Sequence, residues 1–119
     1  MSINMKRVFF VMLICLLVLG MASSSLCAES TQPIIIDVRT EAEWKTGHLE
    51  GVILIPYEEI GDKIGSFAKN KSERIYVYCR SGKRAQIAKE TLEKMGYTDV
   101  VNLGSLEEAA NALKMRIVK

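Results

Sequence analysis

Short apolar runs rich in β-branched residues recur along the chain and alternate with stretches of helical periodicity. The first run, "IIIDV" at residues 34–38, is almost continuously apolar. Such a run is typical of a strand that is buried on both faces of a sheet. Three further runs of this kind occupy residues 51–56, 74–79 and 99–103. Strands that alternate with helices predict an α/β fold, in which a parallel sheet of four to five strands is flanked by helices.

The stretches between the apolar runs carry the signals of helices. We expect helices at residues 40–47, 57–70, 82–96 and 105–115. Thr40 and Ser105 are good N-cap residues for the first and last of them, because their hydroxyl oxygens can accept a hydrogen bond from a free backbone N–H group. Gly61 and Gly65 weaken the second helix, since glycine has a low helix propensity.

The first 28 residues have the layout of a secretory signal peptide. Two basic residues precede an apolar run at residues 8–21, and small polar residues follow it. The run is shorter than the roughly 20 residues that a transmembrane helix needs. We therefore expect residues 1–28 to be a signal peptide, cleaved after Ala28 or a few residues earlier, with a membrane anchor as the alternative. Residues 29–119 would then form one domain, exported and periplasmic in a Gram-negative bacterium, with membrane contact only through the signal segment.

The charge of the chain gives no sign of a nucleic-acid partner. Its net charge of +2 comes from 16 basic and 14 acidic residues. Lys6 and Arg7 lie in the signal segment, which holds no acidic residue, so residues 29–119 carry 16 − 2 = 14 basic and 14 acidic residues. No stripe of basic and aromatic residues is present that would indicate binding of DNA or RNA. Nothing in the sequence predicts an oligomeric state.

Cys79 is the lone cysteine of the expected domain, because Cys15 and Cys27 lie in the signal segment. An exported protein often has disulfides, but this cysteine has no partner within the domain. It is a buried structural thiol, one half of an intermolecular disulfide, or a reactive thiol. Its position at the end of the third strand favours reactivity, since ligands of parallel sheets bind beyond the carboxyl ends of the strands.

The residues after Cys79 favour a reactive thiolate. Arg80, Lys83 and Arg84 supply positive charge, and a helix is expected to begin among them. Cations and helix N-termini stabilise a nearby thiolate. Gly82 allows a tight turn whose backbone N–H groups form an anion-binding nest. Cations are unfavourable at a helix N-terminus, so this cluster indicates an anion-binding loop rather than a solvated start of a helix.

Two motifs resemble the rhodanese (thiosulfate sulfurtransferase) family, in particular its exported single-domain members of the phage shock protein E type. The first is "IIDVRTEAEWKTGHLEGVILIP" at residues 35–56. The second, "VYCRSGKRA" at residues 77–85, matches the active loop C-x-x-G-x-R of the family from Cys79 to Arg84. The similarity continues through residues 95–109 and covers nearly the whole domain. The resemblance implies a rhodanese-like domain at residues 29–119.

The resemblance also implies a mechanism. The Cys79 thiolate takes the outer sulfur of thiosulfate, releases sulfite and becomes a persulfide, from which cyanide or a thiol removes the sulfur. Arg84 would brace the loop, while Arg80 and Lys83 would attract the anion. Ser81 and the backbone N–H groups would donate hydrogen bonds to the sulfur or to sulfite. This chemistry needs no cofactor and no metal.

Other polar residues of the first motif are expected to be structural. His48, the single histidine of the chain, is far from Cys79 in the sequence, and a cationic loop needs no histidine to make a thiolate. Sequence spacing alone does not exclude a hydrolase in which His48 would act as the base for Cys79. We interpret Asp37 and Arg39 as a charged pair that ties the end of the first strand to the domain.

The sequence has three alternative interpretations besides a sulfurtransferase. Tyrosine phosphatases also use a cysteine loop closed by an arginine, but they place five residues between the two, whereas four separate Cys79 from Arg84 here. The shorter ring has room for one sulfur atom rather than for a phosphoryl group. Arsenate reduction is a minor alternative. A persulfide carrier with little turnover of free thiosulfate is the non-catalytic alternative.

Overall fold

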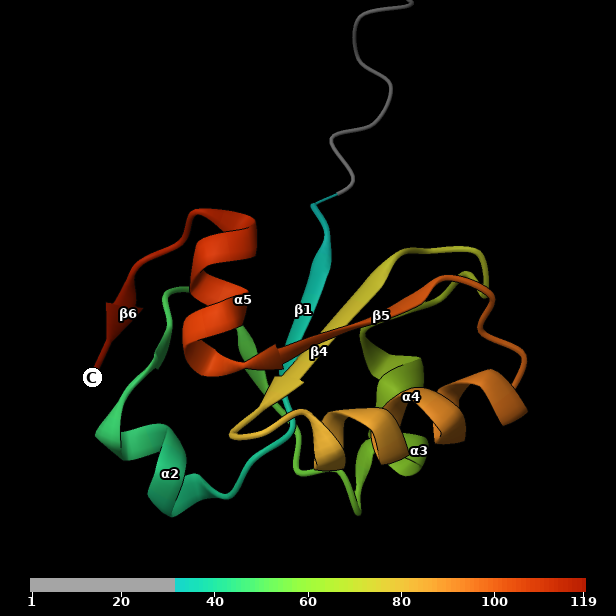
Figure 1. Ribbon diagram of the computed structural model, residues 1–119. Helices are drawn as coiled ribbons and strands as arrows, with labels where there is room; N and C mark the ends of the chain where they lie inside the picture. Colours follow the sequence, from blue (N-terminus) through green and yellow to red (C-terminus); the bar gives the residue numbers. More distant parts are fainter. Residues whose placement is uncertain (1–31) are drawn as a thin grey trace, which may run out of the picture. The chain divides into compact units, whose positions relative to one another are not determined.

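The centre of the domain is a parallel sheet of four strands (Figure 1). The computed structural model describes residues 32–119, so the expected signal segment, 1–28, lies outside the described residues. In the order β3-β1-β4-β5, the strands are Ile53–Leu54, Ile34–Asp37, Ile75–Cys79 and Val100–Ser105. All neighbouring pairs are parallel. The predicted α/β class is confirmed, with four strands in the sheet.

Helices cover both faces of this sheet, as Figure 1 shows. One face is covered by α3 (Ile60–Lys63), the 3-10 turn η1 (Ile64–Ser66) and α4 (Lys83–Lys94). The opposite face is covered by α5 (Leu106–Leu113), and α2 (Glu41–Thr46) follows β1. Within the described part of the chain, no helix has both the length and the apolar character needed to cross a membrane.

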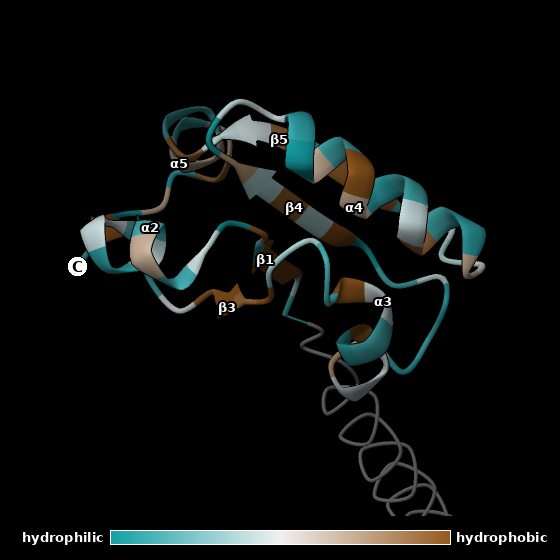
Figure 2. Ribbon diagram, turned by 90° about the horizontal axis from the view of Figure 1, so that it is seen from below, coloured by the Kyte–Doolittle hydropathy of each residue, from teal (hydrophilic) through white to brown (hydrophobic). Residues whose placement is uncertain are grey.

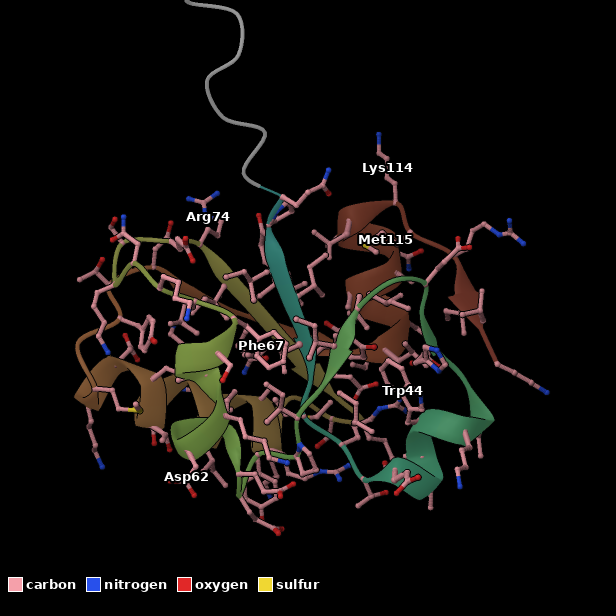
Figure 3. The ribbon with its side chains drawn as sticks, turned by 180° about the vertical axis from the view of Figure 1, so that it is seen from behind. Trp44, Asp62, Phe67, Arg74, Lys114 and Met115 are labelled. Atoms are coloured by element: carbon pink, nitrogen blue, oxygen red, sulfur yellow. The ribbon has the colours of Figure 1, made fainter. Side chains whose placement is uncertain are left out.

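One predicted helix is wrong in its extent. Residues 57–70 form only the single turn of α3 and the 3-10 turn η1 rather than one continuous helix. Gly61 and Gly65 lie within these two turns, and their low helix propensity accounts for the short segments. Phe67 is the C-cap residue of η1 and is 45% exposed (Figure 3).

The predicted N-caps are confirmed, and each forms a complete capping box. The Thr40 hydroxyl accepts from the backbone N–H of Glu43 at 3.2 Å, and the Glu43 carboxylate accepts in return from the Thr40 N–H. Ser105 and Glu108 repeat this arrangement at the start of α5. Each box satisfies backbone donors that the first turn of a helix leaves free.

The side chains of β4 alternate between the two faces of the sheet. Ile75, Val77 and Cys79 belong to the core packed against α3 and α4, whereas Tyr78 belongs to the core under α5. In Figure 2 the strands β1 and β3 are coloured as hydrophobic, in agreement with a sheet covered on both faces. The alternation of β4 therefore places the Cys79 side chain on the face that α4 covers.

A second, two-stranded sheet was not predicted. In it, β2 (His48–Leu49) pairs antiparallel with β6 (Ile117–Val118). The chain leaves α5 through Lys114, whose φ of 52° is in the left-handed region, and returns toward β2. The Leu49 N–H donates to the Tyr78 hydroxyl at 3.2 Å and so ties this small sheet to β4. Strands of two residues leave too little sequence pattern for prediction.

Candidate active site

Cys79 is the last residue of β4, and its side chain is fully buried. Its sulfur accepts a hydrogen bond from the backbone N–H of Gly82 at 2.9 Å. The loop can curl back over the sulfur because Gly82 has a φ of 90°, which lies in the left-handed region that glycine adopts readily. Cys79 is a free cysteine within the described residues.

The loop leads directly into the N-terminus of α4, which has no side-chain cap. Gln86 makes the first bond of the helix, its N–H donating to the Gly82 carbonyl at 2.9 Å. The N–H groups of residues 83–85 precede this bond and have no acceptor within the helix. Free N–H groups and the helix dipole together make a site for an anion, here beside a cysteine sulfur.

Arg84 lies at this N-terminus but points its charge toward α2. Its two terminal nitrogens donate to the two carboxylate oxygens of Glu43 at 2.7 and 2.9 Å. Both side chains are 27% exposed. The hydrogen bonds from Arg84 lower the pKa of Glu43 to about 2, against the opposing effect of burial. The pair joins α2 to α4 and neutralises the charge of Arg84.

Asn102 of β5 holds the loop from the other side. Its amide nitrogen donates to the Gly82 carbonyl at 3.0 Å, and its amide oxygen accepts from the Gly104 N–H at 2.9 Å. A Cβ atom on Gly82 would lie 3.3 Å from the Gly104 Cα, so the loop is packed tightly against β5. Glu43 and Asn102 thus hold the two sides of the loop.

Asp37 and Arg39 form the buried ion pair that the sequence predicts. The Arg39 guanidinium donates to both Asp37 carboxylate oxygens, the shortest distance being 2.7 Å. It also donates to the Gly47 carbonyl at 2.6 Å. These bonds tie the end of β1 to the end of α2, which is a structural role.

His48 also has the structural contacts that we expected. Its ring stacks on Trp44 with the ring centroids 3.5 Å apart and the planes 5° from parallel. Its Nδ1 atom lies 2.8 Å from the Trp44 carbonyl oxygen, and Figure 3 shows Trp44 on α2. Both interactions engage the ring with α2, so the histidine is not arranged as a base for Cys79.

Two hollows flank the loop at the carboxyl edge of the sheet. A cleft of about 670 Å³ has Arg80, Arg39, Glu43 and Glu107 among its lining residues. A second hollow of about 400 Å³ is lined by Ser81, Gly82, Lys83, Asn102 and neighbouring residues of β5 and α5. Arg80 and Lys83, for which the family resemblance implies attraction of the substrate, therefore line different hollows.

The structure gathers the residues Cys79 to Arg84 around one turn, and it adds two that sequence reasoning missed. Glu43 lies within the first motif, but nothing in the sequence joins it to Arg84, 41 residues away. Asn102 lies 20 residues from Gly82 on another strand. Their assignment to the loop requires the tertiary contacts.

Several known proteins are similar to this chain in sequence or in fold. PspE, a thiosulfate sulfurtransferase of Escherichia coli strain K12, is 39% identical over 75 residues, which are 63% of this chain and 72% of PspE. A sulfurtransferase of Allochromatium vinosum is 30% identical over 76 residues, covering 64% of this chain and 69% of that protein. A solved structure of a rhodanese with anions from E. coli matches with a TM-score of 0.67 and 36% identity, covering 74% of this chain and 99% of that one. The family description "Rhodanese-like domain" matches residues 24–112. On sequence and fold together, the chain belongs to the rhodanese-like domain family.

Proposed function

We propose that the protein is a thiosulfate sulfurtransferase that carries sulfur as a persulfide on Cys79. The observation that carries this proposal is the position of the Cys79 sulfur. It accepts a hydrogen bond from the Gly82 N–H at the start of α4, a helix without a side-chain cap. Helix N-termini and nearby cations favour the nucleophilic thiolate. Relatives named as sulfurtransferases support sulfur transfer in general.

In the first half-reaction, the Cys79 thiolate attacks the outer sulfur of thiosulfate. The sulfur–sulfur bond of thiosulfate breaks, sulfite leaves with the electron pair, and the outer sulfur stays on Cys79 as a persulfide anion. The N–H groups at the start of α4 would stabilise the negative charge of donor and leaving group. Arg80 and Lys83, both exposed, would attract the dianion.

In the second half-reaction, cyanide or a thiolate attacks the outer sulfur of the persulfide. The new bond forms to the acceptor, the Cys79–sulfur bond breaks, and Cys79 returns to the thiolate. No electrons are gained or lost overall, so the cycle needs neither a cofactor nor a metal.

The arrangement of Arg84 argues against phosphatase activity. In a phosphatase loop the closing arginine must bind phosphoryl oxygens, but both ends of the Arg84 guanidinium are occupied by the Glu43 carboxylate. The four residues between Cys79 and Arg84 also make a ring smaller than that of phosphatases. Both features favour transfer of a single sulfur atom.

We also propose that the protein is exported and that residues 1–28 are its signal peptide, on the sequence layout described above. The mature chain would begin at Glu29. Determination of the N-terminal residue of the protein secreted by its host tests this, and an intact N-terminus at Met1 would contradict cleavage.

Release of sulfite from thiosulfate with cyanide as acceptor tests the sulfurtransferase proposal. We expect steady turnover by the wild type and none by Cys79→Ser. Mass spectrometry after thiosulfate treatment should show a gain of one sulfur atom on the peptide that holds Cys79. Sulfur on Cys79 without turnover would indicate a persulfide carrier instead, and equal activity of the serine variant would refute both roles.

A further inference from the structure

Asn102 uses both ends of its side-chain amide between β5 and the cysteine loop. The Nδ2 group donates to the Gly82 carbonyl at 3.0 Å and to the Gln86 Oε1 atom at 3.3 Å. The Oδ1 atom accepts from the Gly104 N–H at 2.9 Å. A carbonyl can only accept and a backbone N–H can only donate, so these contacts permit a single orientation of the amide. The side chain is therefore fixed to β5 at one end and to the loop at the other.

Gly82 connects Asn102 to the nucleophile. Its N–H donates to the Cys79 sulfur at 2.9 Å, and its carbonyl accepts from Asn102. These two groups are joined through the φ and ψ bonds of one residue, and a glycine has no side chain that could hold them by packing. Because Asn102 anchors the carbonyl to the central sheet, it restricts the direction in which the Gly82 N–H points.

The same anchor orients the first free N–H group of α4. The Gly82 carbonyl also accepts from the Gln86 N–H at 2.9 Å, so it has two donors. The peptide between Gly82 and Lys83 is trans. In a trans peptide, the N–H group lies in the plane of the carbonyl and points the opposite way. The Lys83 N–H therefore points out of the N-terminus of α4, where the free N–H groups make the anion site.

The burial of Cys79 makes these donors important. Its side chain is fully buried, so water does not hydrate the sulfur in this structure. Negative charge on a buried atom must be stabilised by hydrogen bonds from the protein. The Gly82 N–H supplies such a bond, and Asn102 holds the glycine that supplies it.

We infer that Asn102 is a positioning residue for the proposed sulfur transfer and that it acts on Cys79 through Gly82. It keeps the Gly82 N–H on the sulfur and the Lys83 N–H at the anion site. Because it acts on the nucleophile rather than on the donor, its loss should slow the loading of Cys79 by the same factor for different donors. In loading, the outer sulfur bonds to Cys79 as sulfite leaves thiosulfate with the electron pair. The inference rests on the proposed persulfide of Cys79.

Single-turnover loading of the protein measures this role. The gain of sulfur on Cys79 is followed by mass spectrometry, per folded molecule, against the concentration of thiosulfate and, separately, of polysulfide. Asn102→Ala should lower the maximal rate about three- to tenfold with either donor, as for loss of one hydrogen bond, and leave the half-saturating concentration unchanged. Tyr78→Phe, which also removes a hydrogen bond but on the other face of the sheet, is the control and should keep the wild-type rate.

Asn102→Asp separates the two ends of the amide. Aspartate keeps an acceptor for the Gly104 N–H, but it places an oxygen instead of Nδ2 against the Gly82 carbonyl. Its maximal loading rate should therefore fall at least as far as that of Asn102→Ala. Gln86→Glu is the matched control for the added charge, because it places a carboxylate in the same hollow and keeps an acceptor for Asn102. It should raise the half-saturating concentration of thiosulfate and leave the maximal rate unchanged.

Amide hydrogen exchange at Gly82, measured by NMR, gives a readout that does not depend on activity. The Gly82 N–H should exchange about three- to tenfold faster in both Asn102 variants than in the wild type and in Gln86→Glu, because the glycine has lost the bond that anchors its carbonyl.

The inference is overturned if either Asn102 variant keeps the wild-type maximal rate, if Tyr78→Phe loses as much, or if loading slows without faster exchange at Gly82. A failure of the proposed function would look different. If thiosulfate does not load Cys79 but polysulfide does, the proposed donor is wrong while the role of Asn102 is still measured. If neither donor loads Cys79, the proposed persulfide is wrong, and the inference that rests on it fails with it.

Discussion

Replacement of Glu43 by glutamine removes the carboxylate that holds Arg84 at the start of α4. Glutamine keeps the length of the side chain, one carbonyl acceptor and its place in the capping box with Thr40. The change is therefore confined to the charge and to one of the two hydrogen bonds from Arg84. We expect a less stable domain and a less ordered loop around Cys79.

The magnitude follows from the pKa of Glu43, which the hydrogen bonds from Arg84 lower from 4.5 to about 2. At 1.36 kcal/mol per pKa unit, this difference corresponds to at most about 3 kcal/mol of stability at neutral pH. Because the side chains are 27% exposed and Thr40 contributes to the shift, solvent screening and the remaining glutamine contact reduce the expected loss to about 1–2 kcal/mol.

The loss should depend on pH in a defined direction. The folded chain has the lower pKa, so the contribution of Glu43 is complete above its ordinary pKa of 4.5 and declines as the pH falls toward about 2. The free energies of unfolding of the wild type and of Glu43→Gln should therefore differ at pH 7 and converge as the pH is lowered from 4.5 toward 2.

Equilibrium unfolding in urea, followed by circular dichroism and by the fluorescence of Trp44, measures this difference. Urea is preferred to guanidinium because it does not screen charges. The control is Glu41→Gln, whose partner Lys45 lies 3.5 Å away with both side chains more than 70% exposed, and whose loss should stay below about 0.5 kcal/mol.

A double-mutant cycle with Arg84→Gln completes the test. The two single losses should not add, and the coupling energy should be about 1–2 kcal/mol, as for residues in direct contact. A coupling near zero, or equal losses for Glu43→Gln and Glu41→Gln, would refute the reasoning that this pair holds the loop.

Three further replacements test the packing around the nucleophile. Gly82→Ala should lower the free energy of unfolding by about 1–3 kcal/mol, because a φ of 90° strains any other residue and the new Cβ would lie 3.3 Å from the Gly104 Cα. Urea unfolding and sulfite release should both show the loss, and a fully active variant would contradict it. Asn102→Ala should cost about 1–2 kcal/mol, since the Gly82 carbonyl and the Gly104 N–H lose their partner. Urea unfolding measures this loss, and an unchanged stability would remove Asn102 from the support of the loop. Tyr78→Phe should cost about 1–3 kcal/mol, because the buried Leu49 N–H loses its acceptor, yet it should leave sulfite release per folded molecule unchanged.

Local sequence signals were enough for much of the fold. The β-branched runs predict the four parallel strands, because each run reflects burial of its own residues on both faces. Thr40 and Ser105 predict where α2 and α5 begin, since a capping box involves residues only three positions apart. The same locality explains why Cys79 and its loop could be chosen as the candidate site.

Other features follow only from the tertiary structure. The pairing of β2 with β6 has no sequence pattern long enough to predict it. The split of Arg80 and Lys83 between two hollows also depends on the folded arrangement.

The sequence by itself therefore determined the parallel α/β fold and the position of the candidate nucleophile, because both arise from neighbouring residues. The tertiary structure decided what supports that nucleophile. β1 and β4 are neighbours in the sheet, so the segments that follow them meet at its carboxyl edge, and Glu43 reaches Arg84. β4 and β5 are also neighbours, which brings Asn102 to Gly82. Strand order rather than sequence spacing sets both contacts, and this is the physical reason that the sequence alone could not predict them.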